Sequence, residues 1–279
     1  MVILLLGSNG YVGTEFKRQL DSCVTISHID IVDENFLREF LLDNPIEFVI
    51  NCAGYVGNPN VDACETQREE TFDGNVLFPL MVQRACSGLV ALGHVSTGCI
   101  YNELDPENPG KEYTELDKPN FDFSSGNSSF YSGTKSLAEK LLMENSEDLY
   151  IWRLRMPFES VPHKKNLLTK LPNYTTVVKA KNSISRLSDF VRCCIESYEK
   201  RIPFGIYNVT NGGHVYFPDL CRSIDNSIKR KYVTVDEISE MFVVPRSNCI
   251  LSNSKLLDTG IEMDDVHTAI EKCREYGKG

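Results

Sequence analysis

The chain has 279 residues, a formal net charge of −10 and a sequence pI of about 5.1. A chain of this length can bury a sizeable core, as one large domain or two smaller ones. Its lysines and arginines are spread among acidic residues, so no basic patch for nucleic acid is expected. No apolar run approaches the roughly 20 residues that cross a bilayer, and the apolar start lacks a preceding basic segment. Neither a membrane span nor a signal peptide is predicted.

The ten cysteines show no CxxC spacing, and two of them, Cys193 and Cys194, are adjacent. Without a secretory signal, free thiols in a reducing compartment are the better interpretation than a disulfide framework. We therefore expect a soluble, cytoplasmic protein without a metal site.

The first half of the chain alternates short apolar runs with helical patterns. Strands are predicted at 2–6 (VILLL), 23–27 (CVTIS), 47–51 (EFVIN), 88–96 (GLVALGHVS) and 149–155 (LYIWRLR), and helices at 11–20 and 34–42. This alternation is typical of a Rossmann-type α/β fold with a doubly wound parallel sheet. The pattern loosens after residue 155. We expect a dinucleotide-binding domain over 1–155 and a smaller α/β substrate lobe over 156–279, with some chain crossing between them.

A glycine-rich stretch separates the first predicted strand from the first helix. Gly7, Gly10 and Gly13 would allow a tight turn, close approach of a phosphate and close helix packing. The pyrophosphate would lie over the helix N-terminus, where free N–H groups favour anions. The next strand ends in small residues that let a ribose and nicotinamide approach. The expected dinucleotide contacts are Gly7, Asn9, Gly10, Tyr11, Val12, Gly13, Asp30, Ile31, Asn51, Ala53, Gly54, Tyr131, Lys135 and Met156.

The end of the second predicted strand bears on which dinucleotide binds. The strand ends in Ser27 and His28, and the carboxylates Asp30 and Asp33 come only later. A carboxylate at the strand end would repel a 2′-phosphate, so its absence favours NADPH over NADH. Asp30 could instead approach the adenine ring.

A tyrosine and a lysine stand four residues apart in FYSGTKSLAEKLL, hence on one helix face. The Lys135 ammonium would stabilise the phenolate of Tyr131 and reach the cofactor's ribose. Thr97 would hydrogen-bond a substrate carbonyl oxygen. A tyrosine and lysine at this spacing also occur by chance, but the glycine loop, the threonine strand end and this helix follow one another in the order that the chemistry needs.

The order GxxGxxG, NCAG, STGCIY and YxxxK resembles the extended short-chain dehydrogenase/reductase family. The likeness is carried further by GYVGNPNVDACE, SFYSGTK, RLRMP, NLLTKL and VPRSN. Within the family it is closest to the bifunctional 3,5-epimerase/4-reductases of UDP-L-rhamnose synthesis, and related to dTDP-4-dehydrorhamnose reductases.

The resemblance implies a role for the cysteine two residues after Thr97. Bifunctional members use a cysteine at this place together with a lysine or histidine from the smaller lobe during epimerisation. Cys99 matches the cysteine and Lys170 the lysine, with His163 as a nearby rival. One residue on each side of the sugar would remove a proton from one face and return it to the other. The alternative for Cys99 is a small buried hydrophobic residue.

Five further residues carry open interpretations. Arg246 would grip the diphosphate or the uridine, or form a surface ion pair. Glu65 would touch substrate or cap a helix, and Asn127 would contact substrate. Arg155 would lie beside the nicotinamide or be structural, and Asn75 would support the active-site strand through a hydrogen bond.

The resemblance therefore implies an NAD(P)H-dependent enzyme converting UDP-4-keto-6-deoxy-D-glucose to UDP-L-rhamnose. The alternatives are a 4-keto-reductase alone, acting on dTDP or GDP sugars, and a non-catalytic dinucleotide-binding regulatory subunit. Thr97, Tyr131 and Lys135 are all intact, which favours an enzyme. The sequence contains no 4,6-dehydratase domain, so the keto-sugar would come from another protein, and a homodimer is one possible assembly.

Overall fold

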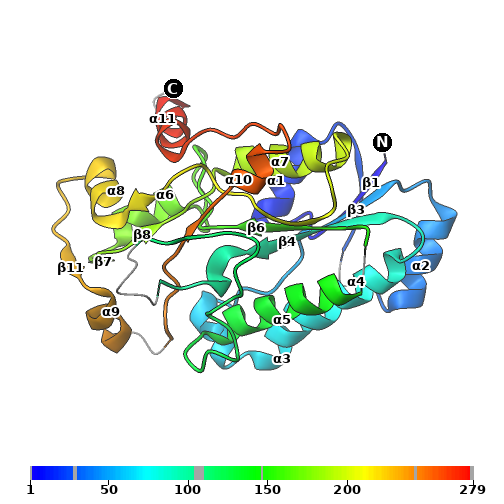
Figure 1. Cartoon of the computed structure of the whole chain (residues 1–279), viewed down its shortest axis with the longest axis horizontal. Coiled ribbons are helices and arrows are strands. Elements are labelled where there is room, and N and C mark those ends of the chain that lie inside the picture. The colour runs from blue at the N-terminus through cyan, green and yellow to red at the C-terminus, as the bar shows by residue number, and fades with distance from the viewer. Residues whose placement is uncertain (1, 28–29, 104–109, 146, 242–243, 277–279) are drawn as a thin grey trace.

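The central feature of the computed structural model, which describes residues 2–27, 30–103, 110–145, 147–241 and 244–276, is a parallel sheet (Figure 1). Its six strands lie in the order β2-β1-β3-β4-β6-β9, and every neighbouring pair is parallel. This confirms the predicted doubly wound α/β class. The strands are β1 (Ile3–Leu6), β2 (Cys23–Ile26), β3 (Phe48–Asn51), β4 (Ala91–Thr97), β6 (Leu149–Leu154) and β9 (Gly205–Asn208).

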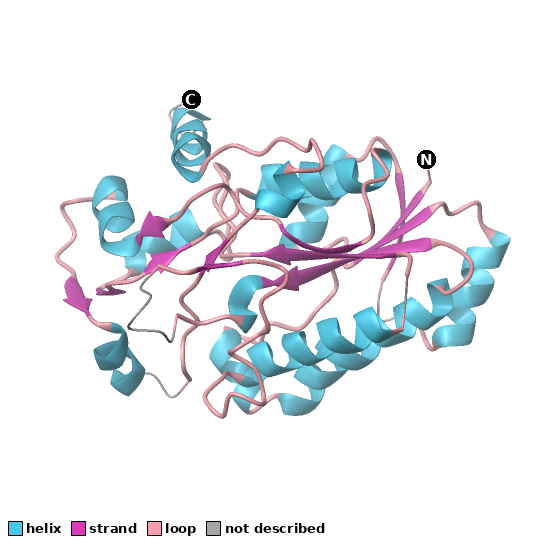
Figure 2. Cartoon of the chain, in the orientation of Figure 1, coloured by secondary structure: helices cyan, strands magenta, loops and turns pink. Residues whose placement is uncertain are grey.

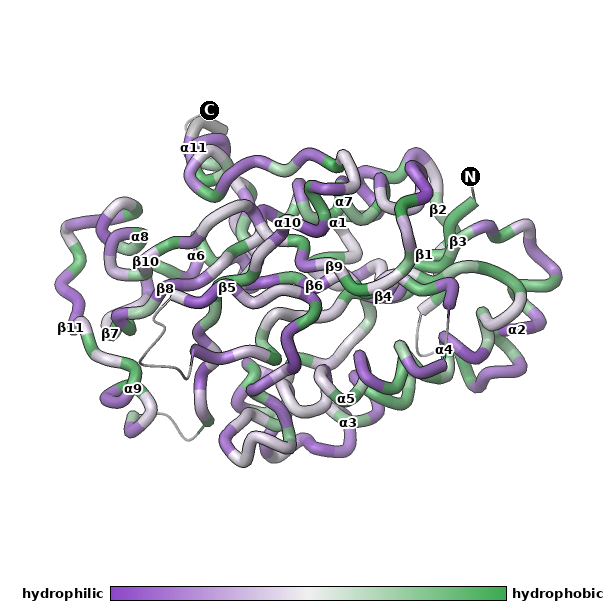
Figure 3. The backbone as a smooth tube through the Cα atoms, in the orientation of Figure 1, coloured by the Kyte–Doolittle hydropathy of each residue, from purple (hydrophilic) through white to green (hydrophobic). Residues whose placement is uncertain are grey.

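Both faces of the sheet are buried because successive strand residues point to opposite sides. Ile3 and Leu5 face the core cluster formed with α1 (Tyr11–Gln19) and α7 (Leu187–Glu199), and Leu4 joins the cluster on the other face. That second face is covered by α2 (Glu34–Asp43), α4 (Phe78–Cys86) and α5 (Phe130–Glu144). The two layers of helices are visible above and below the sheet in Figure 2. The apolar run of β1 is accordingly coloured hydrophobic in Figure 3.

The segment between β3 and β4 positions one side of the site. It contains η1 (Val61–Glu65), α3 (Arg68–Phe72) and η2 (Asp73–Leu77), and η2 is a π-helical turn that runs directly into α4. A π-helical turn of this kind often occurs at functional sites. Beyond β4, the short η3 (Gly98–Ile100) carries the chain over the end of the sheet.

A smaller lobe lies at the carboxyl ends of the parallel strands, on the left in Figures 1 and 2. Its own core includes Phe158, Ile184 and Leu220. Its elements are α6 (Leu167–Lys170), η4 (Leu171–Asn173), β7 (Thr176–Val178), β8 (Lys181–Asn182), β10 (Val215–Tyr216), α8 (Phe217–Ile224), β11 (Lys231–Val233), α9 (Val235–Met241) and α11 (Val266–Tyr276). Strand β11 pairs in parallel with β7, and β10 pairs antiparallel with β8.

The chain crosses between the sheet and the lobe. Strand β9 and helix α7 lie beyond residue 155, yet they complete the main sheet and its upper layer. Conversely, β5 (Glu112–Tyr113) pairs with β12 (Ile250–Leu251), which directly precedes α10 (Ser254–Leu257). Segments from either side of residue 155 therefore pair with each other. Among the described residues, no helix is both long and apolar enough to cross a membrane.

Candidate active site

The loop between β1 and α1 needs its glycines for steric reasons. Gly7 has a φ of +79°, and a Cβ there would lie 2.5 Å from the backbone nitrogen of Ala53. A Cβ at Gly13 would overlap the carbonyl oxygen of Gly7. The N-cap residue of α1, Gly10, has no side chain to cover the first turn, so backbone N–H groups there are open to an anion. This cradle fits the pyrophosphate of a dinucleotide.

The neighbouring strand end is fixed by hydrogen bonds. Asn51 is buried, and its Oδ1 accepts from the Ala53 nitrogen at 3.0 Å. Its Nδ2 lies 3.3 Å from His94 Nδ1. Asn75 holds the following loop, since its Oδ1 accepts from Tyr55 N at 2.8 Å and its Nδ2 donates to Tyr55 O at 2.9 Å. Its Nδ2 also donates to Thr134 Oγ1 of α5 at 3.3 Å. Among the hydrogen bonds of the described residues, the support predicted for Asn75 thus goes to this loop and to α5, and not to β4.

The remaining predicted cofactor contacts differ in exposure. Asn9, Asp30 and Gly54 are exposed, Tyr11 and Val12 are partly buried, and Ile31 is buried. Asp33 caps α2, where its Oδ1 accepts from Phe36 N at 2.8 Å. His28 lies outside the described residues.

Thr97 and Tyr131 meet at the carboxyl end of β4. Thr97 is the last residue of β4 and Tyr131 lies in the first turn of α5. Their side chains share a hydrogen bond, which lowers the pKa of Tyr131. Burial, the largest influence, and the charge of Cys99 nevertheless raise the pKa of this phenol above its ordinary value, while Arg155 acts to lower it. The phenol is accordingly protonated at neutral pH and suited to give a proton to a carbonyl oxygen.

Lys135 is buried one turn along α5, but its partners differ from the expected ones. Its Nζ donates to the Val95 carbonyl at 3.1 Å and lies 3.3 Å from His94 Nε2. Burial lowers the pKa of Lys135 to about 8, partly opposed by Glu139. The helical spacing predicts that the Lys135 charge acts on the Tyr131 phenol, whereas the ammonium is hydrogen-bonded to Val95 of β4.

Cys99 lies beside the threonine, as the sequence order requires. Its backbone nitrogen donates to Thr97 Oγ1 at 3.1 Å, and its sulfur accepts from Arg155 Nη1 at 2.8 Å. Arg155, left open between a cofactor contact and a structural role, is thus brought into the same cluster. Met156 next to it is partly buried and has a φ of +39°, an unusual conformation for a residue with a Cβ.

The two candidate partners of Cys99 both come from the smaller lobe. Lys170 is the last residue of α6, and burial, followed by the charge of Lys165, lowers its pKa. His163 stacks on Tyr11 of the glycine loop, with ring centroids 4.4 Å apart and an interplanar angle of 5°. Among the hydrogen bonds of the described residues, neither side chain reaches Cys99.

The predicted substrate contacts have structural partners. Glu65 accepts from the backbone nitrogen of Phe130 at 2.6 Å, so it caps α5, which is the alternative that the sequence allowed. Arg246 forms an ion pair of 2.7 Å with Asp62. Asn127 is exposed in the loop before α5.

One residue of the cluster, His94, was not predicted to be functional. His94 joins Asn51 to Lys135, and a histidine inside the apolar strand run 88–96 was the signal for it. Desolvation, followed by the Lys135 charge, lowers the pKa of His94, which keeps the ring neutral. Within the described part of the chain, no group of three or more His, Cys, Asp or Glu side chains could hold a metal ion.

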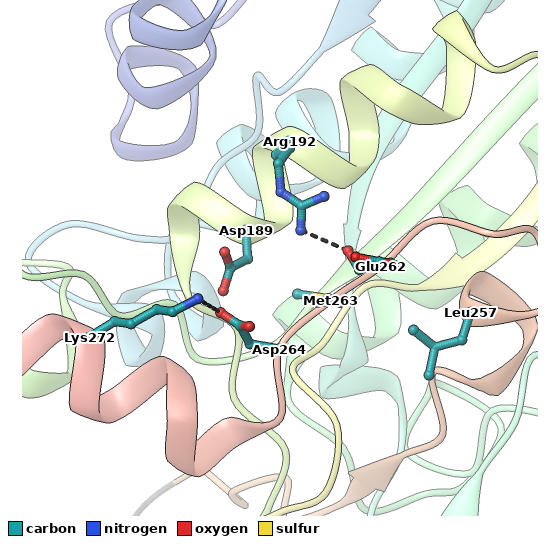
Figure 4. A pocket seen from close by; sticks show the side chains of 7 residues that line it. All are labelled: Asp189, Arg192, Leu257, Glu262, Met263, Asp264 and Lys272. Atoms are coloured by element: carbon teal, nitrogen blue, oxygen red, sulfur yellow. Dashed lines mark hydrogen bonds and ion pairs between the residues drawn. The ribbon is translucent and has the colours of Figure 1, made fainter.

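A surface hollow of about 460 Å³ lies apart from these residues, beside α7 and α11 (Figure 4). Two of its basic side chains have partners within it. Lys272 pairs with Asp264 at 2.5 Å, and Arg192 donates to the Glu262 carbonyl at 2.7 Å. None of the predicted site residues lines the hollow, so it is not the candidate active site.

The fold and the site define an NAD(P)H-dependent enzyme of the extended short-chain dehydrogenase/reductase type. Residues 1–275 match the model of the RmlD substrate binding domain. The chain belongs to that family.

Two relatives from Arabidopsis thaliana share more than a third of their aligned residues with this chain. A bifunctional dTDP-4-dehydrorhamnose 3,5-epimerase/dTDP-4-dehydrorhamnose reductase is 37% identical over 217 residues, which is 75% of this chain and 69% of the relative. A trifunctional UDP-glucose 4,6-dehydratase/UDP-4-keto-6-deoxy-D-glucose 3,5-epimerase/UDP-4-keto-L-rhamnose-reductase is 35% identical over 75% of this chain. The chain spans only 31% of the length of that second relative.

Solved structures share the fold. The L780 UDP-rhamnose synthase of Acanthamoeba polyphaga mimivirus superposes with a TM-score of 0.87 at 23% identity, covering 100% of this chain and 99% of that one. A dTDP-4-dehydrorhamnose reductase from Bacillus anthracis, in complex with NADP, gives a TM-score of 0.77 at 17% identity, covering 97% and 96%. At these identities the likeness shows the fold.

Proposed function

We propose that this enzyme is a bifunctional 3,5-epimerase/4-reductase that converts UDP-4-keto-6-deoxy-D-glucose to UDP-L-rhamnose with NADPH. The observation that carries the proposal is the position of Cys99. Its backbone nitrogen is hydrogen-bonded to the Thr97 hydroxyl, which is in turn hydrogen-bonded to Tyr131. A reductase alone has no need of a proton-accepting group at this place. The two plant relatives, whose names include both epimerase and reductase, support the same pairing of activities.

The side chains suit each step. The hydrogens on carbons 3 and 5 of a 4-keto sugar are acidic because their loss leaves an enolate at the carbonyl. Cys99 and Lys170, from the sheet and from the smaller lobe, would take a proton on one face and return one on the other. Burial lowers the pKa of Lys170, which makes its ammonium a better proton donor on the face opposite Cys99. Thr97 and Tyr131 would hold the enolate oxygen, and Tyr131 would then protonate it.

NADPH, when bound, supplies the hydride for carbon 4. The cradle of Gly7, Gly10 and Gly13 would hold its pyrophosphate, with Asn51, Ala53 and Gly54 beside the nicotinamide side. Lys135 would turn from Val95 to the ribose hydroxyls. The NADP bound by the Bacillus anthracis reductase supports this choice of cofactor.

The proposal extends to the supply of substrate. The keto-sugar would be formed by a 4,6-dehydratase outside these 279 residues, and the enzyme would act in the cytosol. All ten cysteines are free thiols, which supports a reducing compartment.

The test is the identity of the product made in D2O from UDP-4-keto-6-deoxy-D-glucose and NADPH. We expect UDP-L-rhamnose with deuterium at carbons 3 and 5, measured by NMR, and a slower reaction with the dTDP sugar. A reduced product without inversion or deuterium would contradict the epimerase and leave a 4-keto-reductase. Tyr131→Phe is the control, because it should lower reduction by ~10²–10⁴-fold while NADPH still binds.

A further inference from the structure

One buried charge in the site has no acidic partner. Arg155 is 1% exposed and directly follows β6. Its Nη2 donates to Asn182 Oδ1 at 2.6 Å and to the Ser247 carbonyl at 2.7 Å, and both acceptors are neutral. No carboxylate of the described residues forms an ion pair with this guanidinium. Burying a charge without an opposite charge costs free energy, so we expect an anion beside Arg155 in the site.

Two sulfurs are near this guanidinium, and they are not equivalent. Cys249 is fully buried, its thiol donates to the Gly98 carbonyl at 3.3 Å, and burial raises its pKa. It therefore stays a thiol. Cys99 is partly exposed, and its sulfur receives the hydrogen bond from Arg155 Nη1 at 2.8 Å.

The backbone holds this contact in place. A Cβ at Gly98 would lie 3.3 Å from Arg155 Cδ and 2.5 Å from Leu251 Cδ1, so the arginine stem lies against the glycine backbone of η3. The backbone nitrogen of Arg155 donates to Ser185 Oγ at 3.2 Å, and its carbonyl accepts from Ser185 N at 2.8 Å. The absence of a side chain at Gly98, between Thr97 and Cys99, thus leaves room for the guanidinium to contact the sulfur.

We infer that Arg155 is a positioning residue whose guanidinium stabilises the Cys99 sulfur as a thiolate ready to accept a proton from the sugar. The inference rests on the proposed epimerase function. A sulfur lone pair forms the new S–H bond, and the electron pair of the broken C–H bond stays on the keto-sugar as the enolate. Arg155 keeps its own protons throughout, and its charge acts on Tyr131 as well.

The experiment follows the pH dependence of Cys99 alkylation by iodoacetamide, with the Cys99 peptide quantified by mass spectrometry. Wild type, Arg155→Met, Arg155→Lys and Cys249→Ser are compared. Loss of an adjacent opposite charge moves a titration by ~1–3 pH units. We therefore expect the Arg155→Met midpoint to rise by about that much, with alkylation near neutral pH falling roughly tenfold or more. Arg155→Lys should shift less because it keeps the charge, and Cys249→Ser should match the wild type.

An unchanged midpoint in a folded Arg155→Met protein overturns the inference. If circular dichroism shows that this variant does not fold, the wild-type profile decides. A midpoint below that of free cysteine, ~8.5, supports the pairing, and a midpoint at or above that value overturns it. A shifted profile without deuterium exchange at carbons 3 and 5 would refute the epimerase and keep the pairing. Deuterium exchange together with an unshifted alkylation profile would support the epimerase and refute the pairing of Arg155 with Cys99.

Discussion

Two arginines two residues apart illustrate how burial decides the role of a charge. Arg153 Nη2 lies 2.7 Å from Glu139 Oε2, and both side chains are almost fully buried. This pair joins β6 to α5. Arg155 has the same burial and neutral or sulfur partners instead. The RLR sequence contains no sign of this difference, because the carboxylate that distinguishes the two arginines lies in another element.

Lys135 gives the rate a specific dependence on pH. Its pKa is lowered to about 8 by burial, so its ammonium is present below that pH and is lost above it. If the ammonium binds the cofactor's ribose, kcat/KM with NADPH should fall as the pH rises through about 8. The measurement is a rate profile from pH 6.5 to 9.5. Lys135→Arg should not show this fall, because an arginine stays protonated over the whole range. A flat wild-type profile over the whole range would contradict the role.

The regular elements were predictable because buried parallel strands are short apolar runs. The runs at 2–6, 23–27, 47–51 and 149–155 each contain the observed strand within one residue at either end. The stretch 205–208 has a strand pattern too, but its place beyond residue 155 predicts it in the smaller lobe, whereas β9 joins the main sheet. Two-residue strands such as β5 and β12 pair across more than 130 residues, and a pattern that short carries no signal of its partner.

Glu65 should act as a cap on α5. Its carboxylate accepts from the backbone nitrogen of Phe130, the first residue of the helix, where negative charge also suits the helix dipole. Glu65→Ala should therefore lower the free energy of unfolding by ~0.5–2 kcal/mol. Urea denaturation followed by the fluorescence of Trp152, the single tryptophan, measures this. Glu69→Ala, an exposed residue of α3, is the matched control.

The result separates the two interpretations of this residue. A capping role lowers stability and leaves the KM for the sugar nucleotide nearly unchanged. Unchanged stability with a raised KM would show instead that Glu65 contacts substrate.

At the scale of the whole molecule, the candidate site combines residues of the main sheet and its helices with a residue of the smaller lobe. Thr97 and Cys99 come from the end of β4, Tyr131 from α5 and Lys170 from the smaller lobe. The order of motifs predicted the first three together, because β4 and α5 belong to one repeating βα unit. Which lobe residue faces Cys99 depends on how the lobe packs on the sheet, and no local pattern encodes that.

The epimerase reaction should therefore fail when either the main sheet or the smaller lobe loses its acid–base group. Cys99→Ala should reduce exchange of solvent deuterium into carbon 3 or carbon 5 by ~10²–10⁴-fold, the usual contribution of a general acid or base. Lys170→Ala should give a matching defect, at the same carbon or the other one. His163→Gln should exchange normally, because His163 stacks on Tyr11. All three should still reduce an already epimerised 4-keto sugar, since Thr97 and Tyr131 are untouched. NMR of the recovered sugar measures exchange. Wild-type exchange in both alanine variants would refute the two-base reaction, and a defect in His163→Gln alone would move the second role from Lys170 to His163.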